Sequence, residues 1–241
     1  PSMYWQLYDY YMIPVPAYYG VKKGNNPQQL IYNYGDNGIY AVNETLSESN
    51  NIKAIISGYS LDSKLLYTKE VSFSIGSNEA KKIFDVDNSN KNTFLKLILL
   101  DGQNKPIADN FYVLSSTQDI HNWDKTTWVG TPMKEYSDFK DLANIASSEL
   151  KINVTHTEKA GTLSIEIENP TTNFAFFTEF LLKDNNGEII YPVYWEDNYI
   201  SFLPGEKRTL QCSFGADMIQ SSATTLQVNG WNLKEQVISL K

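Results

Sequence analysis

Residues 161–169 read GTLSIEIEN, and the alternation in this stretch decides the fold class. From Leu163 to Glu168 the odd positions are apolar and the even positions are polar. Side chains of a β-strand point to opposite faces in turn, so this pattern predicts a strand with one face in a core and one in water.

The same rhythm continues on both sides of this stretch. Runs of strand length lie at 150–158, 161–169, 175–184, 188–195, 199–203, 207–214, 224–230 and 235–240. Seven or eight short strands within about ninety residues are typical of an immunoglobulin-like sandwich. We therefore predict such a domain over residues 149–241.

The first half of the chain shows a second set of short β-branched and aromatic runs. They lie at 29–34, 38–43, 51–61, 65–75, 80–86, 92–100 and 105–114, and turn-forming Gly, Asn and Asp residues separate them. Residues 25–116 are therefore predicted to form another immunoglobulin-like sandwich. The two halves share no repeated motif, so the fold class is all-β with two like domains and no sign of recent duplication.

Residues 117–148 interrupt the strand rhythm and are predicted to form an ordered linker. Polar residues mix there with Trp123, Trp128 and Tyr136, which we expect to pack on one another. Ser137 is a plausible N-cap for a short helix with Leu142 on its apolar face.

Residues 1–24 are unlike the rest of the chain because aromatic side chains crowd them. Apolar residues fall at helical spacing at Tyr4, Leu7, Tyr8 and Tyr11. This spacing predicts a short helix capped by Ser2 that ends near Met12, because Pro14 and Pro16 cannot continue it. Such a segment either packs on a following domain or belongs to a domain whose remainder lies elsewhere, and we favour the second.

Composition excludes several classes of partner and site. Lys and Arg number 20 and Asp and Glu 28, a net charge of −8, which disfavours nucleic acid and anionic membranes. No run of about 18 apolar residues could cross a bilayer, and no signal-peptide pattern opens the chain. The single cysteine, Cys212, can form neither an intrachain disulfide nor a zinc site.

No catalytic or metal-binding motif stands out. The only histidines, His121 and His156, suit a linker surface and an exposed strand position, and Cys212 suits a buried inert thiol. Residues 85–90 (DVDNSN) carry oxygen ligands but lack the glycine and glutamate of a calcium loop, so a turn is the better interpretation. We predict no catalytic residue, no metal ligand and no cofactor.

The densest polar and aromatic cluster is the stretch YWEDNY at 194–199. Aromatic faces beside carboxylates and amides suit sugars, although the same residues could fill the end of a sandwich. Adjacent carboxylates on a strand point to opposite faces, so Glu196 and Asp197 cannot flank one glycosidic bond. The candidates for a substrate rim are Trp195, Glu196, Asp197 and Asn198.

Four stretches resemble one enzyme family. Residues 1–23 look like the last segment of the catalytic barrel in glycoside hydrolase family 2, in the branch of exo-β-D-glucosaminidases and β-mannosidases. Residues 29–46 and 109–145 resemble the start and end of the immunoglobulin-like domain behind that barrel, and residues 169–210 resemble the terminal domain. The stretch NWDKTTW at 122–128 is the most specific and favours the glucosaminidase branch.

The resemblance implies a non-catalytic fragment of a retaining exo-glycosidase. Residues 1–24 would be a helical remnant of the (β/α)8 barrel, whose missing part would be the fragment's partner and hold both catalytic glutamates. The family suggests a bacterial parent that works outside the cytoplasm, in the periplasm or secreted.

Two functions follow for the fragment. In the first, the sandwiches are a scaffold that braces the barrel and shapes one rim of its pocket. In the second, the terminal domain is an independent carbohydrate-binding module with Trp195 or Trp231 as its platform. We favour the scaffold because the aromatic candidates also fit as packing residues.

Overall fold

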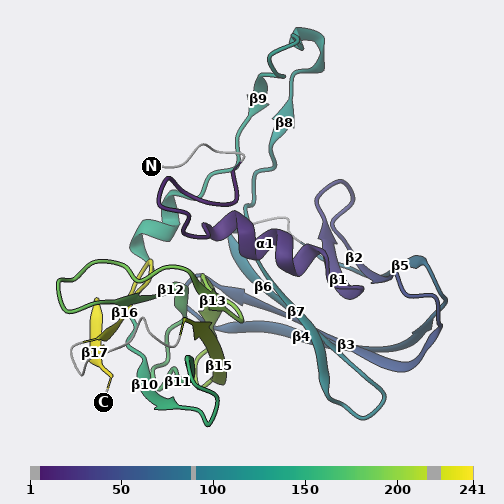
Figure 1. Cartoon of the computed structure of the whole chain (residues 1–241). Coiled ribbons are helices and arrows are strands. Elements are labelled where there is room, and N and C mark those ends of the chain that lie inside the picture. The colour runs from purple at the N-terminus through teal and green to yellow at the C-terminus, as the bar shows by residue number, and fades with distance from the viewer. Residues whose placement is uncertain (1–5, 88–90, 216–223, 241) are drawn as a thin grey trace. The chain divides into compact units, whose positions relative to one another are not determined.

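The computed structural model describes residues 6–87, 91–215 and 224–240 and divides the chain into two compact units (Figure 1). One unit runs from Asn25 to Ile145. The other combines residues 1–24 with residues 146–241, so it is built from both ends of the sequence. Each unit contains an antiparallel β-sandwich, and the prediction of two immunoglobulin-like domains is confirmed.

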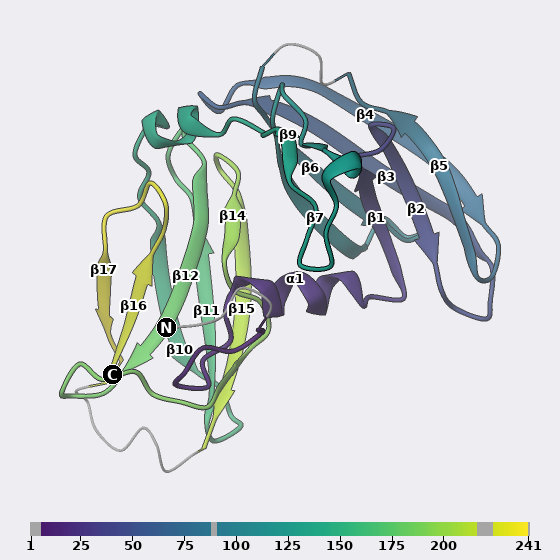
Figure 2. The ribbon, with the colours of Figure 1, turned by 90° about the horizontal axis from the view of Figure 1, so that it is seen from above.

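The unit from Asn25 to Ile145 holds the seven strands expected between residues 29 and 114. They are β1 (Gln28–Asn33), β2 (Gly38–Asn43), β3 (Ser49–Ser60), β4 (Leu65–Ile75), β5 (Glu79–Asp85), β6 (Thr93–Leu100) and β7 (Pro106–Leu114). The strand orders are β1-β2-β5 and β4-β3-β6-β7, and the first can be followed in Figure 2.

Strand β6 lies at the centre of this core. It pairs with β3 and β7, and six of its eight residues are buried, so its sequence TFLKLILL shows no alternation. Lys96 is the one charged residue of this strand. Its side chain is only 3% exposed and forms an ion pair with Asp109 on β7. Burying an ammonium group is costly unless a carboxylate accompanies it, which explains the pairing.

Residues 119–137 form a hairpin rather than a compact linker. Strands β8 (Ile120–His121) and β9 (Met133–Glu135) pair with each other and with no other described strand, and a 3-10 helix, η1 (Trp123–Lys125), lies between them. In Figure 1 the hairpin extends beyond the sheets of its own unit. Trp123, Trp128 and Tyr136 are exposed, so the prediction that they order the linker by packing together is wrong.

The short helix predicted after Ser137 is present in a modified form. Residues Lys140–Asn144 form a 3-10 helix, η2, with Leu142 buried. Phe139 occupies the N-cap position without a side-chain hydrogen bond, so Ser137 is not the cap. Instead, the Asp138 carboxylate accepts a hydrogen bond from the Lys140 backbone N–H at 3.0 Å.

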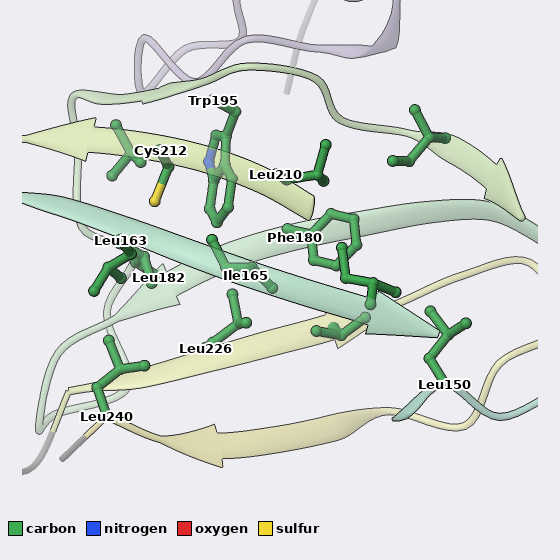
Figure 3. Packing of buried hydrophobic residues seen from close by; sticks show 14 of the residues in the cluster. Leu150, Leu163, Ile165, Phe180, Leu182, Trp195, Leu210, Cys212, Leu226 and Leu240 are labelled. Carbon is green, nitrogen blue, oxygen red and sulfur yellow. The ribbon is translucent and has the colours of Figure 1, made fainter. Parts of the chain in front are cut away.

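The second sandwich has eight strands, as predicted. They are β10 (Lys151–His156), β11 (Thr162–Glu168), β12 (Ala175–Lys183), β13 (Val193–Trp195), β14 (Ile200–Phe202), β15 (Lys207–Phe214), β16 (Thr225–Asn229) and β17 (Gln236–Ser239). The orders β10-β11-β15-β13 and β14-β12-β16-β17 place apolar side chains of both sheets in one core (Figure 3). The alternation of 163–168 is confirmed, since Leu163, Ile165 and Ile167 are buried.

The one α-helix among the described residues, α1 (Pro16–Gly24), is not where the sequence predicted a helix. Residues 6–12 are not helical, and residues 1–5 lie outside the described residues. The Asp9 carboxylate accepts hydrogen bonds from the N–H groups of Tyr11 and Ile13, both at 2.9 Å, and this turn competes with a helix. Pro16 opens α1 because the first helical residue needs no N–H donor.

Helix α1 belongs to the second sandwich in space. Tyr19 is buried and counts among the core residues of that domain, and Tyr18 packs against the same core. The structure thus packs the aromatic segment on the C-terminal domain, which was the alternative that the sequence argument did not favour.

Candidate functional site

The predicted rim loop, residues 195–198, begins with a side chain that lies in the core. Trp195 pairs with Cys212 across β13 and β15, is only 7% exposed and has its ring 6.0 Å from that of Phe180. Figure 3 shows the indole among the aliphatic side chains of the two sheets. Trp195 therefore cannot offer its face to a sugar, and its predicted role as a platform is wrong.

Asn198 is buried and serves the backbone. Its Oδ1 accepts hydrogen bonds from the N–H groups of Phe180 and Tyr199 at 2.9 Å, and its Nδ2 donates to the Phe180 carbonyl at 3.0 Å. Strand β14 does not extend as far as Phe180, so the Asn198 amide takes the place of a strand partner. Asn198 is therefore a structural residue.

The two carboxylates of the loop point to different partners. Glu196 Oε2 accepts a hydrogen bond from the Gln211 N–H at 3.1 Å, while Asp197 Oδ2 forms an ion pair with Lys23 at 2.9 Å. The two carboxylates thus bind different groups, Glu196 a backbone N–H of β15 and Asp197 a lysine of α1. Both carboxylates hold the loop in place.

Helix α1 supplies two lysines that fasten this loop. Lys22 Nζ donates to the backbone carbonyls of Trp195 and Glu196 at 3.2 and 2.7 Å, and Lys23 binds Asp197. Both lysines lie in the last turn of the helix, where the helix dipole favours positive charge. We call the contacts of Lys22 and Lys23 with residues 195–197 the lysine clamp.

A cavity of about 300 Å³ lies beside the clamp, and we call it the aromatic pocket. Its lining comes from the N-terminal segment and from the strands and loop around β13. Six of the lining residues are tyrosines, namely Tyr8, Tyr18, Tyr19, Tyr191, Tyr194 and Tyr199. Among the described residues that line it there is no carboxylate or imidazole side chain, so the pocket lacks the paired acid and base that glycoside hydrolysis uses.

The pKa is raised above its ordinary value in three of these tyrosines, Tyr8, Tyr19 and Tyr199. Burial raises the pKa of Tyr19 and of Tyr199 above the ordinary value of 10.0, and the hydrogen bond from the Tyr199 hydroxyl to Glu179 at 2.7 Å raises that of Tyr199 further. Both hydroxyls therefore stay protonated at neutral pH, and that of Tyr199 donates its hydrogen bond to Glu179.

The remaining candidates behave as the sequence predicted. Cys212 is buried, and its burial raises the pKa of the thiol to about 12, as expected for an inert thiol. His156 and His121 are both exposed. The predicted turn at 85–90 lies partly outside the described residues, at positions 88–90.

The described parts of the chain hold no cluster of three or more His, Cys, Asp or Glu side chains suited to a metal ion. Within the same parts, no helix has the length and apolar character needed to span a membrane.

The sequence argument missed the N-terminal half of the site. Tyr8, Tyr18, Tyr19, Lys22 and Lys23 all come from the segment that it assigned to another domain. The available signal was a pair of lysines at the end of a helix that starts at a proline, which would have placed the helix correctly.

The sheets of the two units define a pair of immunoglobulin-like domains. Residues 128–233 match the exo-β-D-glucosaminidase Ig-fold domain family, and residues 36–119 match the mannosidase Ig/CBM-like domain family. The two halves of the chain thus each match an immunoglobulin-like domain family, one named for exo-β-D-glucosaminidases and the other for mannosidases.

Similar proteins span nearly the whole chain. It is 28% identical to an exo-β-D-glucosaminidase of Arthroderma benhamiae over 99% of its residues and 29% identical to one of Streptomyces avermitilis over 98%. These matches cover 27% of each relative, so the chain spans little more than a quarter of their length.

Solved structures agree with these relatives. The Amycolatopsis orientalis exo-chitosanase CsxA superposes with a TM-score of 0.89 at 28% identity, over 99% of this chain and 29% of that one. A β-D-mannosidase from Dictyoglomus thermophilum, at 19% identity and a TM-score of 0.62 over 95% of this chain and 24% of that one, shares the fold.

Proposed function

We propose that this chain is the non-catalytic accessory part of an exo-acting β-glycosidase that releases amino sugars, and that it braces the catalytic barrel. The lysine clamp is the observation that carries the proposal. It fixes the N-terminal segment, which resembles the end of a catalytic barrel, to the C-terminal sandwich through Lys22, Lys23 and the buried Tyr19.

The brace works by removing freedom from the N-terminal segment. Two lysines bind three consecutive residues of one loop, and Asn198 anchors that loop to β12. A barrel joined to this segment would be held in a fixed position relative to the C-terminal sandwich. Since catalysis depends on reacting groups held to within about 1 Å, a stiff attachment supports turnover without touching substrate.

The relatives supply the class of substrate for this proposal. The curated ones are named exo-β-D-glucosaminidases, so we assign an amino-sugar substrate to a longer polypeptide that carries this chain behind a catalytic barrel. We keep the place of action outside the cytoplasm that the sequence resemblance suggests. The pocket of this chain lacks an acid and base pair among its described lining residues, so we assign the chain alone no hydrolytic activity.

The test compares this 241-residue chain with a polypeptide that carries it behind a catalytic barrel. Hydrolysis of 4-nitrophenyl β-D-glucosaminide and β-D-mannoside is measured for both. We expect release of 4-nitrophenol by the longer polypeptide only, with the glucosaminide preferred. Pure chain that turns over either substrate, or a longer polypeptide that turns over neither, would contradict the proposal.

The clamp itself is tested in the longer polypeptide with K22A/K23A. We expect kcat to fall while the fold persists, because the barrel loses part of its attachment. A matched control is K151A, which removes a lysine from the exposed edge strand β10 of the same domain. Equal kcat values for the clamp variant and this control would contradict the bracing role.

A carbohydrate-binding terminal domain is the second candidate. Trp231 is 58% exposed, with its ring packed edge-on to Phe176 at 6.2 Å, so one indole remains accessible on this domain. Calorimetry with W231A, included in the experiment below, tests this candidate.

A further inference from the structure

Exposed aromatic side chains gather on the hairpin of residues 119–137, which we call the aromatic hairpin. Trp128 is 97% exposed and Trp123 70% exposed, and Val129 and Tyr136 are also exposed. Large aromatic side chains are usually buried, so such a concentration on one short element indicates a binding surface.

These aromatic side chains do not hold the hairpin together. Backbone hydrogen bonds do so, from Asn122 N–H to Pro132 O at 2.8 Å and from Thr127 N–H to Gly130 O at 3.0 Å. The hydroxyls of Thr126 and Thr131 add a bond at 3.1 Å across the hairpin. Because small polar groups and the backbone maintain its shape, the tryptophans are available for another purpose.

Two of the rings already form a flat surface. The imidazole of His121 stacks on the indole of Trp123 with centroids 5.0 Å apart and planes 19° from parallel. The imidazole covers one face of the indole and holds the ring in place, and with Trp123 70% exposed the opposite face is open to a sugar ring. Trp128 offers a second ring further along the same hairpin, so the element has two separate aromatic surfaces.

Charges around these rings favour a cationic ligand. Residues 119–137 contain three carboxylates (Asp119, Asp124 and Glu135) and two lysines (Lys125 and Lys134), a net charge of −1. The whole chain carries −8. Asp124 lies directly beside Trp123, and Glu135 pairs with Ile120 across the hairpin. An ammonium group gains from both a carboxylate and an aromatic face.

We propose that the aromatic hairpin binds a β-linked glucosamine chain, with sugar rings stacked on Trp128 and on the His121–Trp123 pair. The amino groups of the chain then lie near Asp124 and Glu135. The choice of glucosamine as the ligand rests on the proposed function. The inference that the hairpin is a binding surface rests on its exposed rings and its charges. The site holds the polymer and takes no part in bond cleavage.

The experiment is titration calorimetry of the 241-residue chain with a glucosamine hexamer, using W123A, W128A and W231A. We expect W123A and W128A each to raise Kd by about fivefold, because each substitution removes one contact between an aromatic ring and a cationic sugar. W128Y should retain most of the affinity, and W231A should bind as the parent does. Both hairpin tryptophans are exposed, so their replacement leaves the fold intact, which circular dichroism checks.

One further ligand and a change of salt concentration test the role of charge. The N-acetylated hexamer lacks the positive charges and should bind more weakly, and added salt should weaken binding of the glucosamine hexamer alone. Absence of binding by the parent chain, or unchanged affinity in W123A and W128A, overturns the inference. Loss of binding in W231A alone overturns it in favour of a site on the terminal domain.

Acrylamide quenching of tryptophan fluorescence in the longer polypeptide tests the alternative that the hairpin packs on protein. Tryptophans shielded from acrylamide without sugar, and unaffected by the hexamer, would show that the hairpin packs on protein and overturn the inference. The hydrolysis assay is independent of these measurements. A hairpin that binds no sugar would therefore leave the proposed accessory function unaffected.

Discussion

Trp195 shows how one side chain can look functional in sequence and be structural in the fold. It stands in a polar and aromatic cluster that suits a sugar site, yet its indole packs on Phe180 inside the sandwich. The neighbouring Val193 offered the missing signal. Residues two apart on a strand share a face, so a buried Val193 places Trp195 in the core as well.

W195A is expected to lower the free energy of unfolding by about 3–5 kcal/mol, because it removes a buried aromatic and leaves a cavity. W231A, which changes a half-exposed tryptophan of the same domain, should cost far less. Urea unfolding followed by circular dichroism measures both. Similar costs for the two variants would contradict the placement of Trp195 in the core.

Cys212 should resist thiol reagents in the folded protein. Its burial raises the pKa of the thiol to about 12, so at pH 8 only about one molecule in ten thousand carries the reactive thiolate. Ellman's reagent should therefore label the unfolded chain quickly and the native chain very slowly. Rapid labelling under native conditions would show that the β13–β15 pair opens.

At the scale of elements, the strands could be predicted closely and the helix could not. Alternation and turn residues located all seven strands of the first sandwich and all eight of the second, because each run packs one face on a core. Residues 4–11 had helical spacing, but the Asp9 carboxylate captures two backbone N–H groups and ends any helix there.

The aromatic hairpin escaped prediction for a different physical reason. Its strands are two and three residues long, too short for alternation to be visible, and its tryptophans appeared to be packing residues. Aromatic residues in a sequence carry no information on whether they meet one another or solvent.

The central strand β6 gives a prediction of its own through Lys96. D109A should cost about 3–5 kcal/mol, because it leaves a buried ammonium without its carboxylate. The double variant K96M/D109L should recover most of that loss. E70A removes a partner of Lys53 that is largely exposed and should cost less than about 1 kcal/mol, which provides the control in urea unfolding.

At the scale of the whole molecule, the feature that the sequence did not predict is that the two ends of the chain form one unit. Residues 1–24 and 146–241 form one unit because Tyr19, Lys22 and Lys23 contact elements more than 170 residues away in sequence. Periodicity reports only on local neighbours, so it cannot reveal such a pairing.

Removal of residues 1–24 should destabilise one unit and spare the other. The C-terminal sandwich loses the lysine clamp and the burial of Tyr19, the latter alone worth about 1.5–3 kcal/mol. Differential scanning calorimetry should show one transition shifted to lower temperature while the transition of residues 25–145 stays in place. A shift in both transitions, or in neither, would contradict this assignment of the N-terminal segment.

The same unit should lose stability at alkaline pH. Tyr19 and Tyr199 have pKa values raised above the ordinary 10.0 in the fold, so the folded state retains their protons more tightly than the unfolded state. Their contribution is complete below pH 10 and is lost as the pH rises above it. Urea midpoints between pH 8 and 11 should show this decline, and Y19F should reduce it. A flat profile would contradict the burial of these hydroxyls.

The joining of both chain ends also sets an order of events during protein synthesis. The N-terminal aromatic segment leaves the ribosome before residues 25–145, and its binding surface on residues 181–199 emerges only after them. At a translation rate of about 5–20 residues per second the delay is on the order of ten seconds. Throughout that interval Tyr8, Tyr18 and Tyr19 are without the strands that cover them, so newly made chains need protection from aggregation at this point.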